Sequence, residues 1–356
     1  MKRYLTGLLA LIICLTSVLF AVSCSGGTLY TVSPTDEQKK VVGYMGEFEV
    51  YYDEIYYLTM NYKNQYELKY GEGIWDDIAK AQFYMEDLQN DIIEALAVNY
   101  SALALAKQYG ITVDSAEVVK YRDARMEEMA EEIKQVLIAS YKGDDEAYSP
   151  NQNEINDEYV LQLKDAYMTD RYLRFLYSVD GCVEQLVSKY KDNGKISDDD
   201  AAVEDYIYNN FCRTLHIYIR NDTGESAIEN RAKAQQILDR IDSGKNTFIE
   251  MMERSEDFKT ASTSGYYFCR GEMTDVYESA AYALDINEYS GIIEDGSGFY
   301  IIKRLPIETN YVNSNFEQLK QQYHYGVVND DITNAAKELK FEFTEFGKTL
   351  SLWALK

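Results

Sequence analysis

The sequence reads Phe211-Cys-Arg-Thr-Leu-His216-Ile-Tyr-Ile219, then Gly265-Tyr-Tyr-Phe-Cys-Arg-Gly-Glu-Met273, then Ser297-Gly-Phe-Tyr-Ile-Ile-Lys303, and these three segments decide its fold. The first alternates as a strand does, with Leu215, Ile217 and Ile219 on one face and His216 and Tyr218 on the other. Helical spacing follows over 227–241, 246–254 and 276–284, and strand patterns over 292–294 and 299–304. The spacing therefore predicts a small mixed domain of strand, helices, strand, helix and two strands.

These motifs and their order resemble the parvulin-type prolyl isomerases. The resemblance implies that His216 is the first family histidine and that Asp257 stands where the family has cysteine or aspartate beside the proline carbonyl. It implies a proline pocket formed by Phe268, Met273 and Tyr277, with Tyr277 replacing the usual phenylalanine. The alternative is that Phe268 and Met273 are core residues and His216 a histidine bonded inside the sheet.

The chain departs from the family pattern at two points. Tyr300 fills the position of the second family histidine, and a hydroxyl can still donate and accept a hydrogen bond, so it could share one with His216. The family's Gly-Gly-Asp-Leu-Gly turn is altered to Ser262-Thr-Ser-Gly265-Tyr-Tyr. Two functions remain open: an isomerase with His216, Asp257 and Tyr300 as catalytic residues, or a binding chaperone whose isomerase fold has lost turnover.

The N-terminus predicts export. Lys2 and Arg3 precede an apolar run from Leu5 to Val22, and small residues follow, which is the layout of a secretory signal over residues 1–23. Ala21-Val-Ser-Cys24 resembles a bacterial lipobox, in which Cys24 would carry lipid. The alternative is a retained membrane anchor. Both place the globular part outside the cytoplasm on a membrane, and the acylated cysteine favours the outer face of a Gram-positive cytoplasmic membrane.

Residues 24–40 read as a flexible linker and residues 41–210 as a helical domain. A hairpin is predicted over 41–50, followed by a helix that ends at Tyr70-Gly71. Further helices are predicted over 76–109, 154–177 and 183–190. Another helix is expected to open with Asp114 as its cap and Glu117 answering three residues later. Residues 41–111 are similar to the N-terminal chaperone region of PrsA and SurA foldases. Tyrosines in this region suit weak contact with unfolded chains, or serve as core filler.

Residues 308–356 form a C-terminal segment with helical spacing from Asn315 to Leu339, followed by Phe341-Glu-Phe. In foldases of this type such a tail returns to the N-terminal helices. We therefore expect an α+β protein in which a parvulin-like domain of residues 211–307 is inserted into a mostly helical chaperone domain.

Composition limits the remaining function classes. The formal net charge is −25, and such a surface repels nucleic acid and anionic lipid. The chain has two histidines and no Cys-x-x-Cys, so we expect no metal site and no cofactor. Outside the leader and Cys24 the cysteines are Cys182, Cys212 and Cys269, which predict small core hydrophobes. The expected partners are unfolded exported polypeptides, with a homodimer left open.

Overall fold

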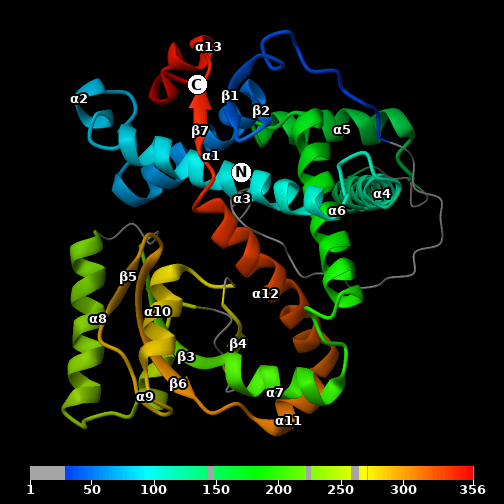
Figure 1. Cartoon of the computed structure of the whole chain (residues 1–356). Helices are drawn as coiled ribbons and strands as arrows, with labels where there is room; N and C mark the ends of the chain where they lie inside the picture. The colour runs from blue at the N-terminus through cyan, green and yellow to red at the C-terminus, as the bar shows by residue number, and fades with distance from the viewer. Residues whose placement is uncertain (1–28, 143–147, 222–225, 258–263, 271, 356) are drawn as a thin grey trace. The chain divides into compact units, whose positions relative to one another are not determined.

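The computed structural model describes residues 29–142, 148–221, 226–257, 264–270 and 272–355 (Figure 1). The predicted signal peptide and Cys24 lie outside these residues. The chain divides into two compact units, the first from residues 1–64, 73–189 and 332–356 and the second from 65–72 and 190–331. Each unit is described by itself.

A three-stranded antiparallel sheet joins the two ends of the chain within the first unit. Strands β1 (Val41–Met45) and β2 (Phe48–Tyr51) form the predicted hairpin around Gly46, whose φ of 59° suits glycine. Strand β7 (Phe341–Phe343) pairs with the other edge of β1, so the order is β2-β1-β7. Figure 1 shows β7 beside β1, although some 300 residues separate them.

The other elements of the first unit are helical. They are α1 (Tyr52–Tyr70), α2 (Ile78–Ala81), α3 (Met85–Gln108), α4 (Ala116–Ser140), α5 (Gln152–Asp165), α6 (Asp170–Asp192), α13 (Glu345–Lys348) and η2 (Leu352–Ala354), with the ends of α1 and α6 crossing into the second unit. The end of α1 at Tyr70 is as predicted. The single helix expected over 76–109 is instead broken by a turn at residues 82–84, where Phe83 N–H donates to the carbonyl of Lys80, three residues back.

The expected cap at Asp114 is wrong. Helix α4 begins at Ala116 with Ser115 as its N-cap residue, and the Ser115 hydroxyl turns back to accept the Thr112 N–H at 2.9 Å. The turn before the helix thus engages the serine hydroxyl, and α4 starts without a side-chain cap.

The predicted break between 177 and 183 is also wrong, because α6 runs through Gly181. A Cβ at that position would lie 3.2 Å from Val118 of α4, so the glycine serves close packing of two helices. The break lies earlier, at Tyr167, which has a φ of 58°. There the Met168 N–H donates to the Leu163 carbonyl at 2.8 Å, which ends α5 as a Schellman turn does.

The second unit contains a four-stranded antiparallel sheet of order β4-β3-β6-β5. Its elements are α7 (Asp200–Asn210), β3 (Cys212–Arg220), α8 (Ala227–Asp242), α9 (Phe248–Met251), η1 (Met252–Arg254), β4 (Tyr266–Phe268), α10 (Asp275–Ala283), β5 (Ile293–Asp295), β6 (Gly298–Leu305), α11 (Thr309–Ser314) and α12 (Phe316–Ala336). The predicted order of strands and helices is confirmed, and so is the mixed α+β class.

The division between the units falls at 189/190 and 331/332, whereas the predicted domain boundaries are 210/211 and 307/308. The difference arises because α7 and α12 pack together within the second unit. Tyr206 of α7 lies 4.2 Å from Tyr323 of α12 between ring centroids, and the Tyr323 hydroxyl accepts the Ser197 N–H at 3.0 Å.

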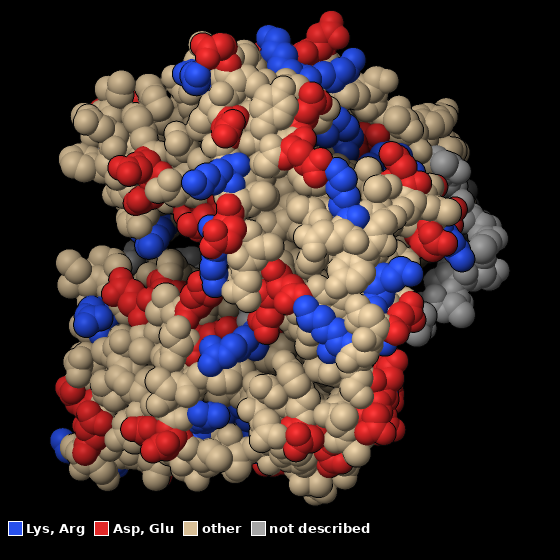
Figure 2. All heavy atoms as spheres, in the orientation of Figure 1, with Lys and Arg blue, Asp and Glu red and all other residues tan. Residues whose placement is uncertain are grey.

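Cys182, Cys212 and Cys269 are buried free thiols, which confirms their prediction as core residues. On the face shown in Figure 2, lysine and arginine side chains stand singly or in small groups among aspartates and glutamates. Within the described ranges, no helix is long and apolar enough to cross a membrane.

Candidate active site

Strand β3 presents His216 on the face of the sheet opposite its main core. Leu215, Ile217 and Ile219 are buried against α8 and α9, as the alternation predicts. His216 points the other way, toward β4, α10 and β6, and its side chain is 5% exposed. The strand thus holds a buried imidazole beside a second apolar cluster.

Both ring nitrogens of His216 have hydrogen-bond partners. Nδ1 lies 2.9 Å from the hydroxyl of Tyr277, and Nε2 lies 3.0 Å from Oδ2 of Asp257. The same Asp257 oxygen accepts the Tyr266 hydroxyl at 2.6 Å, and the Tyr277 hydroxyl lies 2.8 Å from Oγ1 of Thr214. A chain of hydrogen bonds therefore runs from Thr214 through Tyr277 and His216 to Asp257 and Tyr266.

The order of donors in this chain fixes the state of the histidine. A carboxylate only accepts, so Nε2 carries the proton that goes to Asp257, and in the neutral ring Nδ1 then accepts the Tyr277 hydroxyl. Tyr277 in turn accepts from Thr214. Burial lowers the pKa of His216, and the hydrogen bond to Asp257 opposes that shift. The geometry thus selects a neutral imidazole protonated on Nε2.

Aromatic rings surround this imidazole. The Tyr266 ring stacks on it with a centroid distance of 4.8 Å and an interplanar angle of 4°, and the Tyr277 ring meets it edge-on at 5.6 Å. Stacking and hydrogen bonding together leave His216 one orientation.

The predicted pocket residues share one apolar cluster next to His216. Phe268 and Tyr277 are buried in it, with rings 5.8 Å apart in a T-shaped contact, and the partly buried Met273 packs against it. Glu278 of α10 holds the backbone before α10 in place, because one of its carboxylate oxygens accepts the N–H groups of Glu272 and Met273, each at 3.0 Å. The structure therefore brings Phe268, Met273 and Tyr277 together with His216.

Tyr300 and His216 share no hydrogen bond in the part of the chain that the structure describes. In the register of β3 and β6, Tyr300 lies opposite Tyr218, and Ile302 lies opposite His216. Tyr300 accordingly stacks on Tyr218 at 4.4 Å, and its hydroxyl lies 3.2 Å from the Ser297 hydroxyl. Its ring meets His216 edge-on at 5.2 Å, so Tyr300 contacts the imidazole by packing alone.

Sequence reasoning missed Tyr266, Thr214 and the hydroxyl of Tyr277. Tyr266 faces Thr214 in the pairing of β3 and β4, which an alternation pattern in three residues does not reveal. The only available signal was the exchange of phenylalanine for tyrosine at position 277, since a buried hydroxyl needs a partner.

The altered turn lies partly outside the described residues, which resume at Ser264. Gly265 has a φ of 77°, and a Cβ there would lie 2.6 Å from the Thr214 carbonyl oxygen. This glycine therefore permits the close approach of β4 to β3 that places Tyr266 over His216.

The segment that contains these residues is similar to known proteins. Residues 216–305 match the family described as rotamase, PPIC-type PPIASE domain. The peptidyl-prolyl cis-trans isomerase Pin1 of Arabidopsis thaliana is 38% identical over 88 residues, which cover 24% of this chain and 71% of that protein. The foldase protein PrsA of Staphylococcus epidermidis is 30% identical over 149 residues, covering 38% of this chain and 45% of that protein.

Among solved structures, foldase protein PrsA from Streptococcus pneumoniae aligns with 77% of this chain and 95% of its own, at 21% identity and a TM-score of 0.33. The family match, over residues 216–305, covers the strands and helices that surround His216. Through this domain the chain belongs to the PPIC-type, or parvulin, family of peptidyl-prolyl isomerases.

Proposed function

We propose that this protein is an extracytoplasmic foldase that catalyses cis-trans isomerisation of peptide bonds before proline in exported polypeptides. The observation that carries the proposal is the neutral His216 fixed between Asp257 and Tyr277, directly beside the cluster of Phe268 and Met273. The names of the relatives, isomerase and foldase, support the same conclusion.

In this proposal the apolar residues seat the proline ring while its amide bond turns. Rotation meets a barrier of about 20 kcal/mol because resonance gives the C–N bond double-bond character. No bond to the protein is needed. A thousandfold acceleration requires about 4 kcal/mol, which shape complementarity and one or two hydrogen bonds can supply.

Asp257 is proposed to act on the amide electrostatically. The resonance form that stiffens the bond places negative charge on the carbonyl oxygen. A carboxylate beside that oxygen disfavours this form, so the amide twists more readily. His216 and Tyr266 hold the carboxylate in place, and we assign them as its positioning partners.

The test is a proline-peptide isomerisation assay on the wild type and on His216→Ala. Loss of a hydrogen bond to a charged group costs about 2 kcal/mol, so we expect kcat/KM to fall about thirtyfold. His324→Gln is the matched control, since it replaces the chain's other histidine, which lies on α12. A wild-type rate equal to that of buffer would overturn the proposal.

The second candidate is a binding chaperone without turnover. It is favoured by Tyr300, which stands at the position of the second family histidine and bonds to Ser297. In that case the protein would suppress aggregation of an unfolded client while leaving isomerisation at the buffer rate, and His216→Ala would bind clients as well as the wild type. Failure to delay aggregation would exclude this candidate.

We further propose that residues 1–23 are removed as a signal peptide and that Cys24 is acylated, anchoring the protein to the outer face of the membrane. The apolar run and the lipobox-like Ala21-Val-Ser-Cys24 support this address. Mass spectrometry of the mature N-terminus in the wild type and in Cys24→Ala tests it. Detection of residues 1–23 in the mature protein would favour a retained anchor.

We also propose the domain organisation that the sequence predicts. Residues 211–307 would form the isomerase domain, inserted between the helical residues 41–210 and the tail of 308–356. The grouping of residues 332–356 with the N-terminal segments in the first unit supports this plan.

A further inference from the structure

The first unit contains two adjacent cavities that the isomerase chemistry does not use. Their volumes are about 330 and 320 Å³, and Val113, Arg171 and Phe175 line both. Because they share these three residues, the two cavities are direct neighbours, and we refer to them together as the hollow. We call the first cavity the arginine pocket, after Arg122, Arg171 and Arg174 in its lining.

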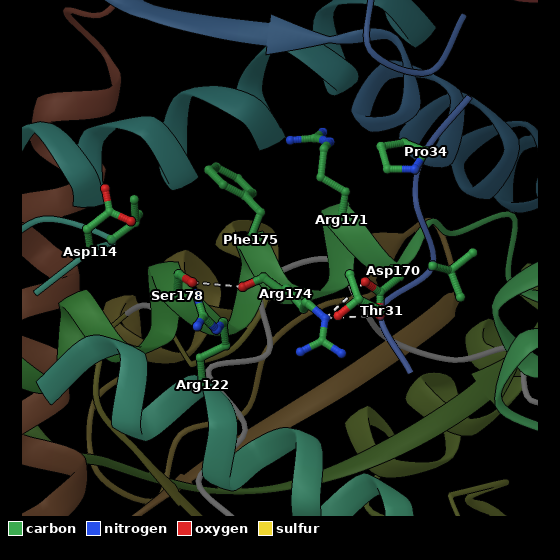
Figure 3. A pocket seen from close by; sticks show the side chains of 11 residues that line it. Thr31, Pro34, Asp114, Arg122, Asp170, Arg171, Arg174, Phe175 and Ser178 are labelled. Atoms are coloured by element: carbon green, nitrogen blue, oxygen red, sulfur yellow. Dashed lines mark hydrogen bonds and ion pairs between the residues drawn. The ribbon is translucent and has the colours of Figure 1, made fainter. Parts of the chain in front are cut away.

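Arg122 and Arg174 bring unsatisfied donors to the arginine pocket. Figure 3 shows Arg174 projecting from α6 and Arg122 rising from α4 toward it. Arg174 bonds both oxygens of Asp170 through Nε, and Arg122 bonds Asp123 through Nε at 3.0 Å. Among the described residues the terminal nitrogens of these two arginines have no hydrogen-bond partner, although only 22% and 25% of the side chains are exposed.

Arg171 differs from its neighbours because a terminal nitrogen, as well as Nε, is bonded to carboxylates. Nε bonds Asp53 at 2.8 Å and an Nη bonds Glu54 at 2.9 Å, and both carboxylates are buried. It therefore serves as a fixed wall of the hollow. The donors left for a ligand belong to Arg122 and Arg174, and partly buried guanidinium groups bind carboxylates strongly.

The second cavity has a different lining. Phe48, Tyr100, Leu103, Ile111 and Phe175 supply apolar and aromatic surface, while the ion pair of Lys107 and Glu47 is at its border. Asp114 also lines the arginine pocket, so the preference for an anion is confined to the free donors of Arg122 and Arg174. A ligand that fills both cavities satisfies these donors with an anionic group and places an apolar group in the second cavity. An extended polypeptide does so within a few residues, because it advances about 3.3–3.6 Å per residue.

We propose that this hollow binds an extended segment of a non-native polypeptide that carries an aspartate or glutamate next to aromatic or aliphatic residues. The inference rests on the proposed function in that the ligand is a client. It assigns the client a chemistry that the net charge of −25 does not suggest, since an acidic protein would otherwise prefer basic segments.

The test is fluorescence anisotropy with a labelled, proline-free probe, Leu-Phe-Leu-Glu-Phe-Asp with an amidated C-terminus, and with the same peptide carrying Gln and Asn in place of its acids. We expect the acidic probe to bind the wild type about tenfold more tightly than the neutral one. Arg122→Gln should remove that difference. Within the described ranges Arg122 bonds only Asp123, whose side chain is 54% exposed, so the variant is expected to fold.

Two further variants keep the test decisive. Val32→Glu places a carboxylate at the wall of the arginine pocket, at a residue that is 37% exposed, and should weaken the acidic probe in the same way. Lys120→Gln removes one exposed cation from α4 outside the pocket and should leave binding unchanged. Equal binding of both probes to the wild type, or an equal effect of Lys120→Gln, would overturn the proposal.

Isomerase activity and probe binding are measured separately in each variant. Arg122→Gln should retain wild-type turnover of a short proline peptide, and His216→Ala should retain binding of the proline-free probe. Loss of isomerase activity with retained probe binding would defeat only the proposed catalytic function, and the reverse would defeat only this inference.

Discussion

One oxygen atom distinguishes Tyr277 from the phenylalanine that is usual at this position in the family. It lies 2.9 Å from His216 Nδ1 and 2.8 Å from Thr214 Oγ1, inside a cluster where a lone hydroxyl would be costly. The hydroxyl oxygen of Tyr277 therefore has a hydrogen-bond partner on each side. It supplies to His216 the hydrogen bond that Tyr300 could have shared.

Removing that oxygen tests its role. A donor to Nδ1 favours neutral imidazole, so Tyr277→Phe should raise the pKa of His216. In the wild type burial lowers this pKa, and activity should therefore hold as pH falls through the usual histidine range near 6.5 and drop only below it. In Tyr277→Phe the acid limb of kcat/KM should move to higher pH. The rate at neutral pH should fall about fivefold, which corresponds to about 1 kcal/mol.

The matched control for this variant is Tyr289→Phe, which removes a hydroxyl bonded to Asp242 in the same domain. Its pH profile should equal that of the wild type. A merely structural role for Tyr277 would lower activity equally at every pH, and that result would contradict the assignment.

A second residue-scale prediction concerns Glu54, which is buried beside Arg171. Burial raises its pKa to about 7, while the charge of Arg171 opposes the shift. The folded state therefore binds more protons than the unfolded state between pH 4.5 and 7, and stability falls as pH rises through this window. A shift of this size corresponds to about 3 kcal/mol.

Glu54→Gln should remove this dependence. The glutamine carbonyl can still accept from Arg171 and the Tyr51 N–H, and its amide can donate to the Tyr100 hydroxyl. Urea unfolding at pH 5 and pH 8 should show the wild type losing stability relative to the variant as pH rises. The exposed Glu47→Gln should track the wild type, and parallel curves for all three proteins would contradict the assignment of this pKa.

At the scale of elements, the sequence patterns predict the positions of most helices and strands, but they do not predict where some of them end. The hairpin at Gly46 and the stop after Tyr70 follow from glycine and alternation. The end of α5 was missed because Tyr167 adopts the left-handed conformation that glycine usually marks. Gly181 was misread as a break because its packing partner, Val118, lies more than 60 residues away.

The same limit applied to the site. The family motifs carry Phe268, Met273 and Tyr277, which share one cluster, but their role as a proline pocket stays a prediction. The partners of His216 depend on the register of β3 with β4 and β6 and on the rotation of α10. Register is a tertiary property: Tyr300 and Ile302 share one face of β6, and a register shifted by two residues would have placed Tyr300 opposite His216.

The pairing of β3 and β6 leads to an element-scale prediction. At Gly298, where β6 begins, an added Cβ would lie 2.1 Å from the Ile219 carbonyl oxygen. Gly298→Ala should therefore separate the strands and destabilise the second unit by about 2 kcal/mol or more in urea unfolding. Gly291→Ala is the control, because an added Cβ there meets no atom within 4 Å. Equal stability of the two variants would show that this end of the sheet tolerates the strain.

At the scale of the whole molecule, the first unit is closed by its own C-terminus. Strand β7 covers an edge of β1, and the Lys63 ammonium donates to the carbonyl oxygens of Trp353 and Leu355 at 2.9 and 2.5 Å. Some 300 residues separate the paired strands, so β7 must be synthesised and brought back to β1 before this sheet can form. Long-range pairing of this kind slows folding, because the chain loses the entropy of loop closure before the strand contacts stabilise it.

Truncation after Leu339 should expose the consequences of that closure. The shortened chain lacks β7, α13 and η2, leaves the edge of β1 unpaired and removes two carbonyl partners of Lys63. We expect the thermal midpoint of the first unit to fall by several degrees or more, while turnover of a short proline peptide persists, since the residues around His216 belong to the second unit. Gly347→Ala should act in the same direction without shortening the chain, because its Cβ would lie 2.0 Å from the Val42 carbonyl oxygen. An unchanged thermal midpoint in both proteins would mean that the helices of the first unit are stable without the strand that joins the ends of the chain.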